Sequence, residues 1–101
     1  RLDKEYVTMS HEVPFLKSRP SHHIKKTFGF GTQPIEEPEY AKDYGKLIEL
    51  LGGDDKIFFA SDWPHYDFDH PRKLLSYPLK DQIKEKIMGK NAIQFFNLHG
   101  F

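Results

Sequence analysis

Residues 56–62, KIFFASD, decide the fold, and residues 63–71, WPHYDFDHP, follow them directly. The run of four apolar residues at 57–60 is typical of a strand in a parallel sheet that is covered on both faces. We therefore expect this strand to be buried. It ends at Asp62, and four further acids or histidines follow by residue 70. An apolar strand that ends in ionisable groups raises the question of what chemistry these groups serve.

The chain before this strand predicts a helix and a second strand. Between residues 40 and 51, apolar side chains recur at the spacing of one helix face, at Tyr44, Leu47, Ile48 and Leu51. The Gly-Gly pair at 52–53 ends this helix. Further upstream, FGF at residues 28–30 suggests a brief strand that the following GTQP breaks. Strand, helix and strand form one parallel βαβ unit, a connection that is nearly always right-handed.

Helices are predicted for most of the remaining chain, at residues 2–13, 20–27, 79–88 and 92–98. Pro14 ends the first, because proline disfavours the helical conformation of the residue before it. Gly89 is expected to end the third helix, and Asn91 to cap the start of the last. Lys80 stands where a capping Ser or Thr is usual, which bears on stability rather than on chemistry.

One βαβ unit is too small to form a stable sheet, because parallel strands need covered faces and three or more strands are generally required. Apolar residues, counted with Gly and without Tyr, are about 40 of 101, which is low against roughly 45–50% in typical domains. We infer that strands are missing, and that a longer parent chain, a partner subunit or self-association supplies them. The first residue is Arg1 rather than Met, which fits an excised piece of a longer protein.

Composition excludes several classes of protein. Fifteen basic and fifteen acidic residues cancel, so there is no net field to attract nucleic acid or an anionic membrane. No apolar stretch approaches the roughly 20 residues that cross a bilayer, and the polar start RLDKEY is no signal peptide, so we expect a cytoplasmic protein. There is no Cys, so a metal site would have to use His and carboxylate ligands.

Asp62 has two interpretations. The carboxyl ends of parallel strands form the rim where α/β enzymes place their chemistry. A carboxylate that is partly desolvated there needs a metal, a cation or hydrogen-bond donors, and a metal would satisfy it. Alternatively, Asp62 caps the following turn and accepts backbone N–H groups around Trp63 and Pro64.

The other histidines and acids give weaker candidates. One is a local metal cluster within HYDFDH, formed by His65, Asp67, Asp69 and His70. The adjacent pair His22 and His23 cannot readily bind one ion, because neighbouring side chains on a helix diverge by about 100°. His11 and His99 lie near the ends of the chain, and we expect both to be solvated.

Three stretches together resemble a known family. They are FFASDWPHYDFDHP, the downstream IKEKIMGKNAIQFF and the upstream EVPFLKSRPSHHIKKTFGFGTQPIEEP. This pattern, from about Glu12 to Leu98, is similar to the C-terminal part of the amidohydrolase-related metal-dependent hydrolases, which include the aminocarboxymuconate-semialdehyde decarboxylase-like proteins. The resemblance implies the last third of a TIM-like (β/α)8 barrel, with the last two strands and the closing helices. Residues 1–101 would then be one fragment of one domain.

The resemblance also implies roles for single residues. Asp62, on strand eight of such a barrel, would contact the catalytic metal and handle a proton of its water. His65 and Gln33 would line the substrate pocket or orient Asp62. The metal would be divalent, with zinc expected, and its other ligands would lie outside these 101 residues. Since a catalytic zinc site needs about three protein ligands, we expect the chain to be inactive by itself.

Three functions follow as hypotheses. The first is a metal-dependent hydrolase that cleaves an amide, ester or related bond of a small-molecule substrate. The second, within the same family, is a non-oxidative decarboxylase that uses the same metal and Asp62. The third is a non-catalytic interaction module that uses exposed aromatic side chains such as Tyr66, Phe68 and Tyr77. The expected partner is the rest of the barrel or a partner chain, and a homo-oligomer is possible.

Overall fold

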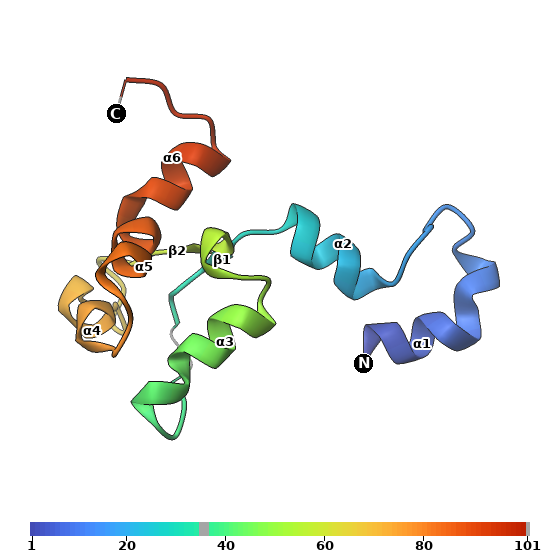
Figure 1. Ribbon diagram of the computed structural model, residues 1–101, viewed down its shortest axis with the longest axis horizontal. Coiled ribbons are helices and arrows are strands. Elements are labelled where there is room, and N and C mark those ends of the chain that lie inside the picture. The colour runs from blue at the N-terminus through green and yellow to red at the C-terminus, as the bar shows by residue number, and fades with distance from the viewer. Residues whose placement is uncertain (35–36, 101) are drawn as a thin grey trace.

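The computed structural model describes residues 1–34 and 37–100 (Figure 1). Helices account for most of the secondary structure, together with three short 3₁₀ turns (η1–η3) and one π-helical turn (η4). In chain order they are α1 (Leu2–Met9), η1 (Ser10–Glu12), α2 (Pro20–Thr27), η2 (Ala41–Asp43), α3 (Tyr44–Leu50), η3 (Asp54–Lys56), α4 (Pro71–Ser76), α5 (Asp81–Glu85), η4 (Lys86–Lys90) and α6 (Asn91–Phe95). Each of these helices is too short or too polar to cross a membrane.

The sheet has two parallel strands, β1 (Phe30–Gly31) and β2 (Ile57–Phe58), with Phe30 opposite Ile57 and Gly31 opposite Phe58. Helix α3 lies between them in the sequence, so the predicted strand–helix–strand unit is confirmed. The pairing continues past the strands through Thr32, whose N–H donates to the Phe58 carbonyl at 2.9 Å. The Thr32 hydroxyl then accepts from the Ala60 N–H at 3.0 Å. This side chain holds the carboxyl ends of the two strands together.

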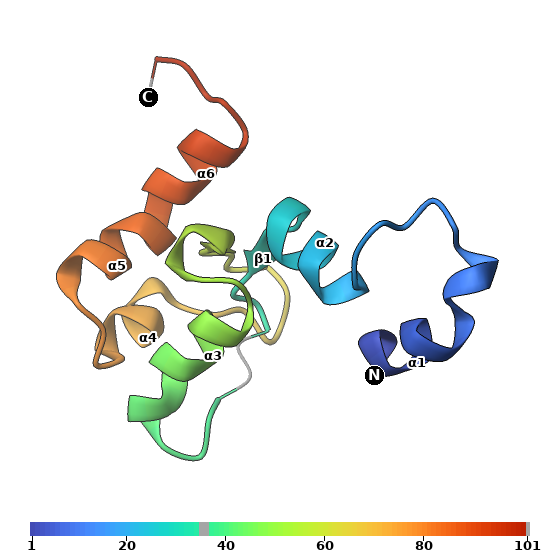
Figure 2. The ribbon, with the colours of Figure 1, turned by 45° about the vertical axis from the view of Figure 1, so that its right-hand side comes forward.

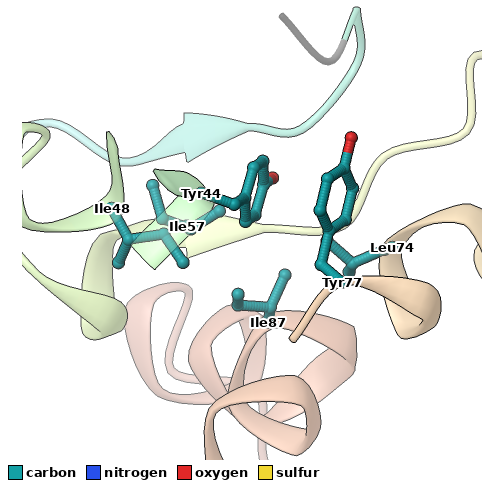
Figure 3. Packing of buried hydrophobic residues seen from close by; sticks show 6 residues of the cluster. All are labelled: Tyr44, Ile48, Ile57, Leu74, Tyr77 and Ile87. Atoms are coloured by element: carbon teal, nitrogen blue, oxygen red, sulfur yellow. The ribbon is translucent and has the colours of Figure 1, made fainter. Parts of the chain in front are cut away.

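The core is small and lies between the sheet, α3 and the C-terminal helices (Figure 3). Its buried members are Tyr44, Ile48, Ile57, Leu74, Tyr77 and Ile87. The rings of Tyr44 and Tyr77 stack with their centroids 4.2 Å apart, which joins α3 to the segment after α4. The expected helix face at residues 44–51 is confirmed, because Tyr44 and Ile48 are buried and Leu47 and Leu51 pack against them.

The second strand is less buried than its sequence predicts. Only Ile57 is buried, while residues 58–60 are half-buried. The expectation of a strand covered on both faces is therefore wrong for the described residues. The physical reason is that a sheet of two strands is too narrow to be enclosed, so its second face is not fully covered by packed elements.

The C-terminal helices form one nearly continuous stretch from α5 through η4 to α6. The sequence predicts that Gly89 ends a helix, but this residue lies inside the π-helical turn η4. Asn91 is not a cap either: it is buried, and its amide donates to the carbonyls of Ile57, at 2.9 Å, and Asp54. The Phe59 N–H donates to the Ile87 carbonyl at 2.8 Å. The edge of β2 opposite β1 is therefore occupied by this stretch.

Helices α1 and α2 form an arm that projects from the body and buries no residue of its own (Figures 1 and 2). Asp3 ties them together, because its carboxylate accepts from the Ser21 N–H at 2.8 Å and from the Ser21 hydroxyl at 2.5 Å. The hydroxyl of Tyr6 donates to the Leu16 carbonyl at 2.9 Å. Pro20 begins α2 at its first position, as expected.

The molecule is extended for its length. Its radius of gyration is 16.1 Å, against about 13 Å for a compact domain of 100 residues. Its accessible surface is 7894 Å², whereas a compact monomer of 11.9 kDa has about 5,900 Å². The chain therefore exposes roughly 2,000 Å² more than a compact protein of its mass.

Candidate metal centre

The candidate site is the loop that follows β2, at residues 61–69. Its two ends are joined by a hydrogen bond from the Asp69 N–H to the Ser61 carbonyl, at 2.9 Å. Inside the loop, the His65 N–H donates to the Asp62 carbonyl at 2.8 Å, which forms a tight turn. Asp62 has a φ of 58°, a left-handed conformation that Asp tolerates better than most residues.

The loop brings Asp62, His65 and Asp67 together, and one possible ligand atom from each lies within 4.8 Å of the others. The Nδ1 atom of His65 is hydrogen-bonded to the Oδ1 atom of Asp67. The same nitrogen lies 3.7 Å from the Oδ2 atom of Asp62, which is too far for a hydrogen bond. The three side chains are about half exposed.

The hydrogen bond between His65 and Asp67 dominates the electrostatics of the loop. It raises the pKa of His65, and the charges of Asp67 and Asp62 act in the same direction. It lowers the pKa of Asp67, so this carboxylate stays ionised. A nitrogen that donates to a carboxylate is not free to bind a metal, because a metal takes the lone pair of a neutral imidazole.

Gln33 reaches the same loop from the end of β1. Its Nε2 atom donates to the backbone carbonyl of Asp67 at 3.2 Å. The structure thus brings together the three residues that the sequence proposes for the site, Asp62, His65 and Gln33, at the carboxyl end of the sheet. Their catalytic roles stay a prediction.

Two members of the predicted HYDFDH cluster lie elsewhere. Asp69 is buried and bonded to Lys73 Nζ at 3.1 Å, and Lys73 also pairs with Glu37 at 2.6 Å. His70 caps the start of α4, where its Nδ1 accepts from the Arg72 N–H at 3.2 Å. A four-residue metal cluster is therefore wrong, because the chain enters α4 at this point and turns these two side chains to structural contacts.

The remaining histidines lie away from this loop. His23 is bonded to Ser18 in the arm, at 2.9 Å, and its ring meets that of His22 edge-on. His11 and His99 are exposed, as expected. None of these four joins the loop in the part of the chain that the structure describes.

Ser61, and not Asp62, caps the turn at Trp63. The Trp63 N–H donates to the Ser61 hydroxyl at 3.3 Å, and no described hydrogen bond brings a backbone donor to the Asp62 carboxylate. This carboxylate is also 54% exposed, so the expected desolvation is not observed in the chain alone. The described sheet has two strands, and no further described strand lies beside this carboxylate.

Comparison with known families then decides what kind of protein this is. A family model described as amidohydrolase matches residues 3–98, nearly the whole chain. The chain belongs to the amidohydrolase family. Amidohydrolases are typically TIM barrels and generally use divalent metals. Membership of the family therefore indicates a function of the metal-dependent hydrolase type. A search of curated proteins gave no match.

The donor set of this amidohydrolase chain fits a divalent metal in part. The Asp62 carboxylate is ionisable, unbonded to backbone donors within the described residues, and a suitable oxygen ligand. Nδ1 of His65 and Oδ1 of Asp67 are used in the hydrogen bond between them, so Asp62 is the member of the three whose ligand atoms no described hydrogen bond engages, where a catalytic zinc site uses about three ligands. Asp62 therefore fits one position of a metal site within the described residues.

Thr32 and Asp67 are the site residues that sequence reasoning missed or undervalued. Thr32 is 4% exposed and holds the two strand ends together, but a Thr after FGFG carries no signal of that role. Asp67 was a predicted metal ligand and is instead the hydrogen-bond partner of His65. The signal for this hydrogen bond in the sequence is the HYD spacing, which places Asp67 two residues after His65.

Proposed function

We propose that the chain is the C-terminal third of a (β/α)8 barrel amidohydrolase that hydrolyses an amide, ester or related bond of a small molecule. In this barrel, β1 and β2 are the last two strands, and Asp62 lies at the rim where the substrate binds. The single observation that carries the proposal is the position of Asp62 in the loop after β2, to which Gln33 is bonded from the end of β1, in a chain that matches the family almost throughout.

Asp62 is proposed to bind the metal through its carboxylate and to accept a proton from water. A divalent ion such as zinc, when bound, lowers the pKa of a water molecule to about 7, so that hydroxide forms near neutral pH. Asp62 is suited to take the proton because its carboxylate is half exposed and engaged by no backbone donor in the described residues. His65 and Gln33 line the same rim, where they contact the substrate or orient Asp62.

The rest of the barrel is the proposed partner of this chain. An open apolar hollow of about 370 Å³ lies beside β1 and α3, and Phe30, Leu47 and Leu51 line it. A further parallel strand beside β1 would fill this hollow. The excess exposed surface supports the same view, because it exceeds the roughly 800 Å² that each partner of a standard interface buries. The chain by itself is proposed to be inactive, since it supplies one metal ligand.

The test is Asp62→Asn in the complete enzyme that contains this chain. Because general acid–base groups contribute about 10² to 10⁴ in rate, we expect turnover to fall by about 10²-fold or more with no change in the far-UV circular dichroism. The matched control is Glu49→Gln, which makes the same type of change on the exposed side of α3. Turnover within a few-fold of the unsubstituted enzyme would contradict the proposal, and release of carbon dioxide from the substrate would identify a decarboxylase instead.

A further inference from the structure

The loop at residues 61–69 contains two carboxylates that approach the same atom of His65. The Oδ1 atom of Asp67 is hydrogen-bonded to Nδ1, whereas the Oδ2 atom of Asp62 is 3.7 Å away from it. Their side chains have similar exposure, 43% and 54%. The difference between the two acids is therefore one of geometry and not of burial.

The chemistry of this hydrogen bond fixes the position of a proton. An ionised carboxylate has no hydrogen to donate, so Nδ1 of His65 must carry the hydrogen of the bond. In a neutral imidazole only one nitrogen is protonated, and the other then presents a lone pair. Asp67 thus determines that Nε2 is the acceptor nitrogen of His65.

The position of Asp67 is itself supported from outside the turn. Gln33, at the end of β1, donates to the backbone carbonyl of Asp67 at 3.2 Å. The hydrogen bond between Asp69 and Ser61 closes the loop behind it, and the Trp63 and Phe68 rings pack edge-on at 4.9 Å within the loop. The strand end and the loop closure together hold Asp67 beside the imidazole.

We infer that Asp67 is a positioning residue, which orients His65 and holds it as the Nδ1–H tautomer, so that Nε2 is the ring nitrogen left to accept a hydrogen bond. The tautomer follows from the loop alone, and only the identity of the group that Nε2 meets rests on the proposed function. Asp67 itself touches no reacting atom in this scheme. Carboxylate–imidazole pairs of this kind set which ring nitrogen is available in many sites.

The experiment is ¹⁵N NMR of the imidazole groups in the full 101-residue chain, recorded at a pH where the histidines are neutral. His65→Asn identifies the His65 signals by their loss. The unsubstituted chain should show His65 protonated mainly on Nδ1. Asp67→Ala should shift His65 toward the Nε2–H form, while the matched variant Asp62→Ala should leave the tautomer of His65 unchanged.

Three outcomes would overturn the inference. They are an Nε2–H form of His65 in the unsubstituted chain, no response to Asp67→Ala, and an equal response to Asp62→Ala. Both substituted side chains are about half exposed, so neither variant removes core packing. The result is separate from the proposed function, because a loss of turnover in the Asp62→Asn enzyme tests the metal role and does not depend on the tautomer of His65.

Discussion

Gly29 shows how a single residue determines the packing beside the sheet. A Cβ atom at this position would lie 2.0 Å from Cε2 of Phe58, so only glycine allows the ring to lie against the chain. The Phe58 ring also packs against Phe95 and Phe96, with centroids 5.0 and 6.0 Å away. The ring therefore has little freedom to move aside.

We expect Gly29→Ala to lower the free energy of unfolding by about 1–3 kcal/mol, because an added methyl group overpacks the contact with Phe58. Urea denaturation measures this value. The control is Gly45→Ala in α3, where the added Cβ meets nothing within 4 Å. That variant should be more stable by about 0.5–1 kcal/mol, because alanine favours the helix. Equal effects of the two substitutions would contradict the packing argument.

For single residues, the sequence predicts which side chains lie near one another better than it predicts their solvent exposure or hydrogen-bond partners. It placed Asp62 at a strand end next to His65 and Gln33, because strand polarity alone decides which residues share that rim. It failed for the desolvation of Asp62, since solvent exposure depends on how many strands surround the loop, and the described sheet has two. It also failed for Asp69 and His70, because the start of α4 at Pro71 redirects their side chains.

Asn91 joins two elements that are distant in the sequence. Its side chain is 3% exposed and donates to the carbonyls of Asp54 and Ile57, at the turn η3 and the start of β2. The Ile57 carbonyl lies on the edge of β2 that faces away from β1. One side chain thus connects the C-terminal helical stretch to the sheet.

We expect Asn91→Ala to lower the free energy of unfolding by about 1–3 kcal/mol, because it leaves the carbonyl acceptor of Ile57 buried without this donor. Thermal unfolding followed by circular dichroism measures the loss. Gln94→Ala, one turn later on the exposed side of α6, is the control and should change stability by less than about 0.5 kcal/mol. A similar loss in both variants would mean that the hydrogen bonds of Asn91 are not responsible, because alanine favours the helix at both positions.

The arm formed by α1 and α2 depends on the ionised form of Asp3. Hydrogen bonds from the Ser21 hydroxyl and then the Ser21 N–H lower the pKa of Asp3 from its ordinary value of 3.8. A lowered pKa in the folded state means that the contact stabilises the arm above pH 3.8. This stabilisation is lost as the pH falls through the pKa of the folded state.

Acidification should therefore release the contact between α1 and α2 only below pH 3.8. The chemical shift of the Ser21 amide, followed by NMR during an acid titration, reports this event. In Asp3→Asn, which cannot ionise, the same amide should show no such transition. A midpoint at or above 3.8 in the unsubstituted chain would show that the Asp3 carboxylate is not held as described.

Elements were predictable where a periodic pattern or a strong breaker was present. The strand–helix–strand unit and the glycine stop after α3 are confirmed, and of the two residues expected near the start of α2, Ser21 and Pro20, the helix begins at Pro20. Helix α4 was missed, because PRKLLS is too short to show a period, although its Leu74 is fully buried. The glycine stop at residue 89 is wrong, since packing of Ile87 and Asn91 continues the helical stretch through it.

The whole molecule exposes more surface than its small core can support. Six buried apolar side chains form the core, while an arm and an apolar hollow beside β1 remain open to solvent. The stability of small domains depends on the fraction of surface that they bury. We therefore expect the arm, the loop at residues 61–69 and the core to unfold with little cooperativity.

We expect the isolated chain to unfold without a single cooperative transition. Trp63, the only tryptophan, reports the loop at residues 61–69, whereas circular dichroism reports the helices. In urea the two signals should give different midpoints, because the loop and the helical arm share few contacts with the core. Coincident, concentration-independent transitions of a soluble monomer would indicate a self-contained domain and contradict the barrel-fragment proposal.

The occupied edge of β2 limits how copies of this chain can associate. In the chain by itself, the Ile87 carbonyl and the Asn91 amide already use the hydrogen-bonding groups of that edge, so copies of this chain can pair only through β1. Closure of the proposed barrel would have to exchange these two bonds for a first strand, because strand eight of a closed barrel pairs on both sides. Two chains that pair edge to edge must then present the same strand to each other, which is a two-fold arrangement that closes at two copies. Head-to-tail growth into a fibre would need a second open strand, and the C-terminal helices cover that strand.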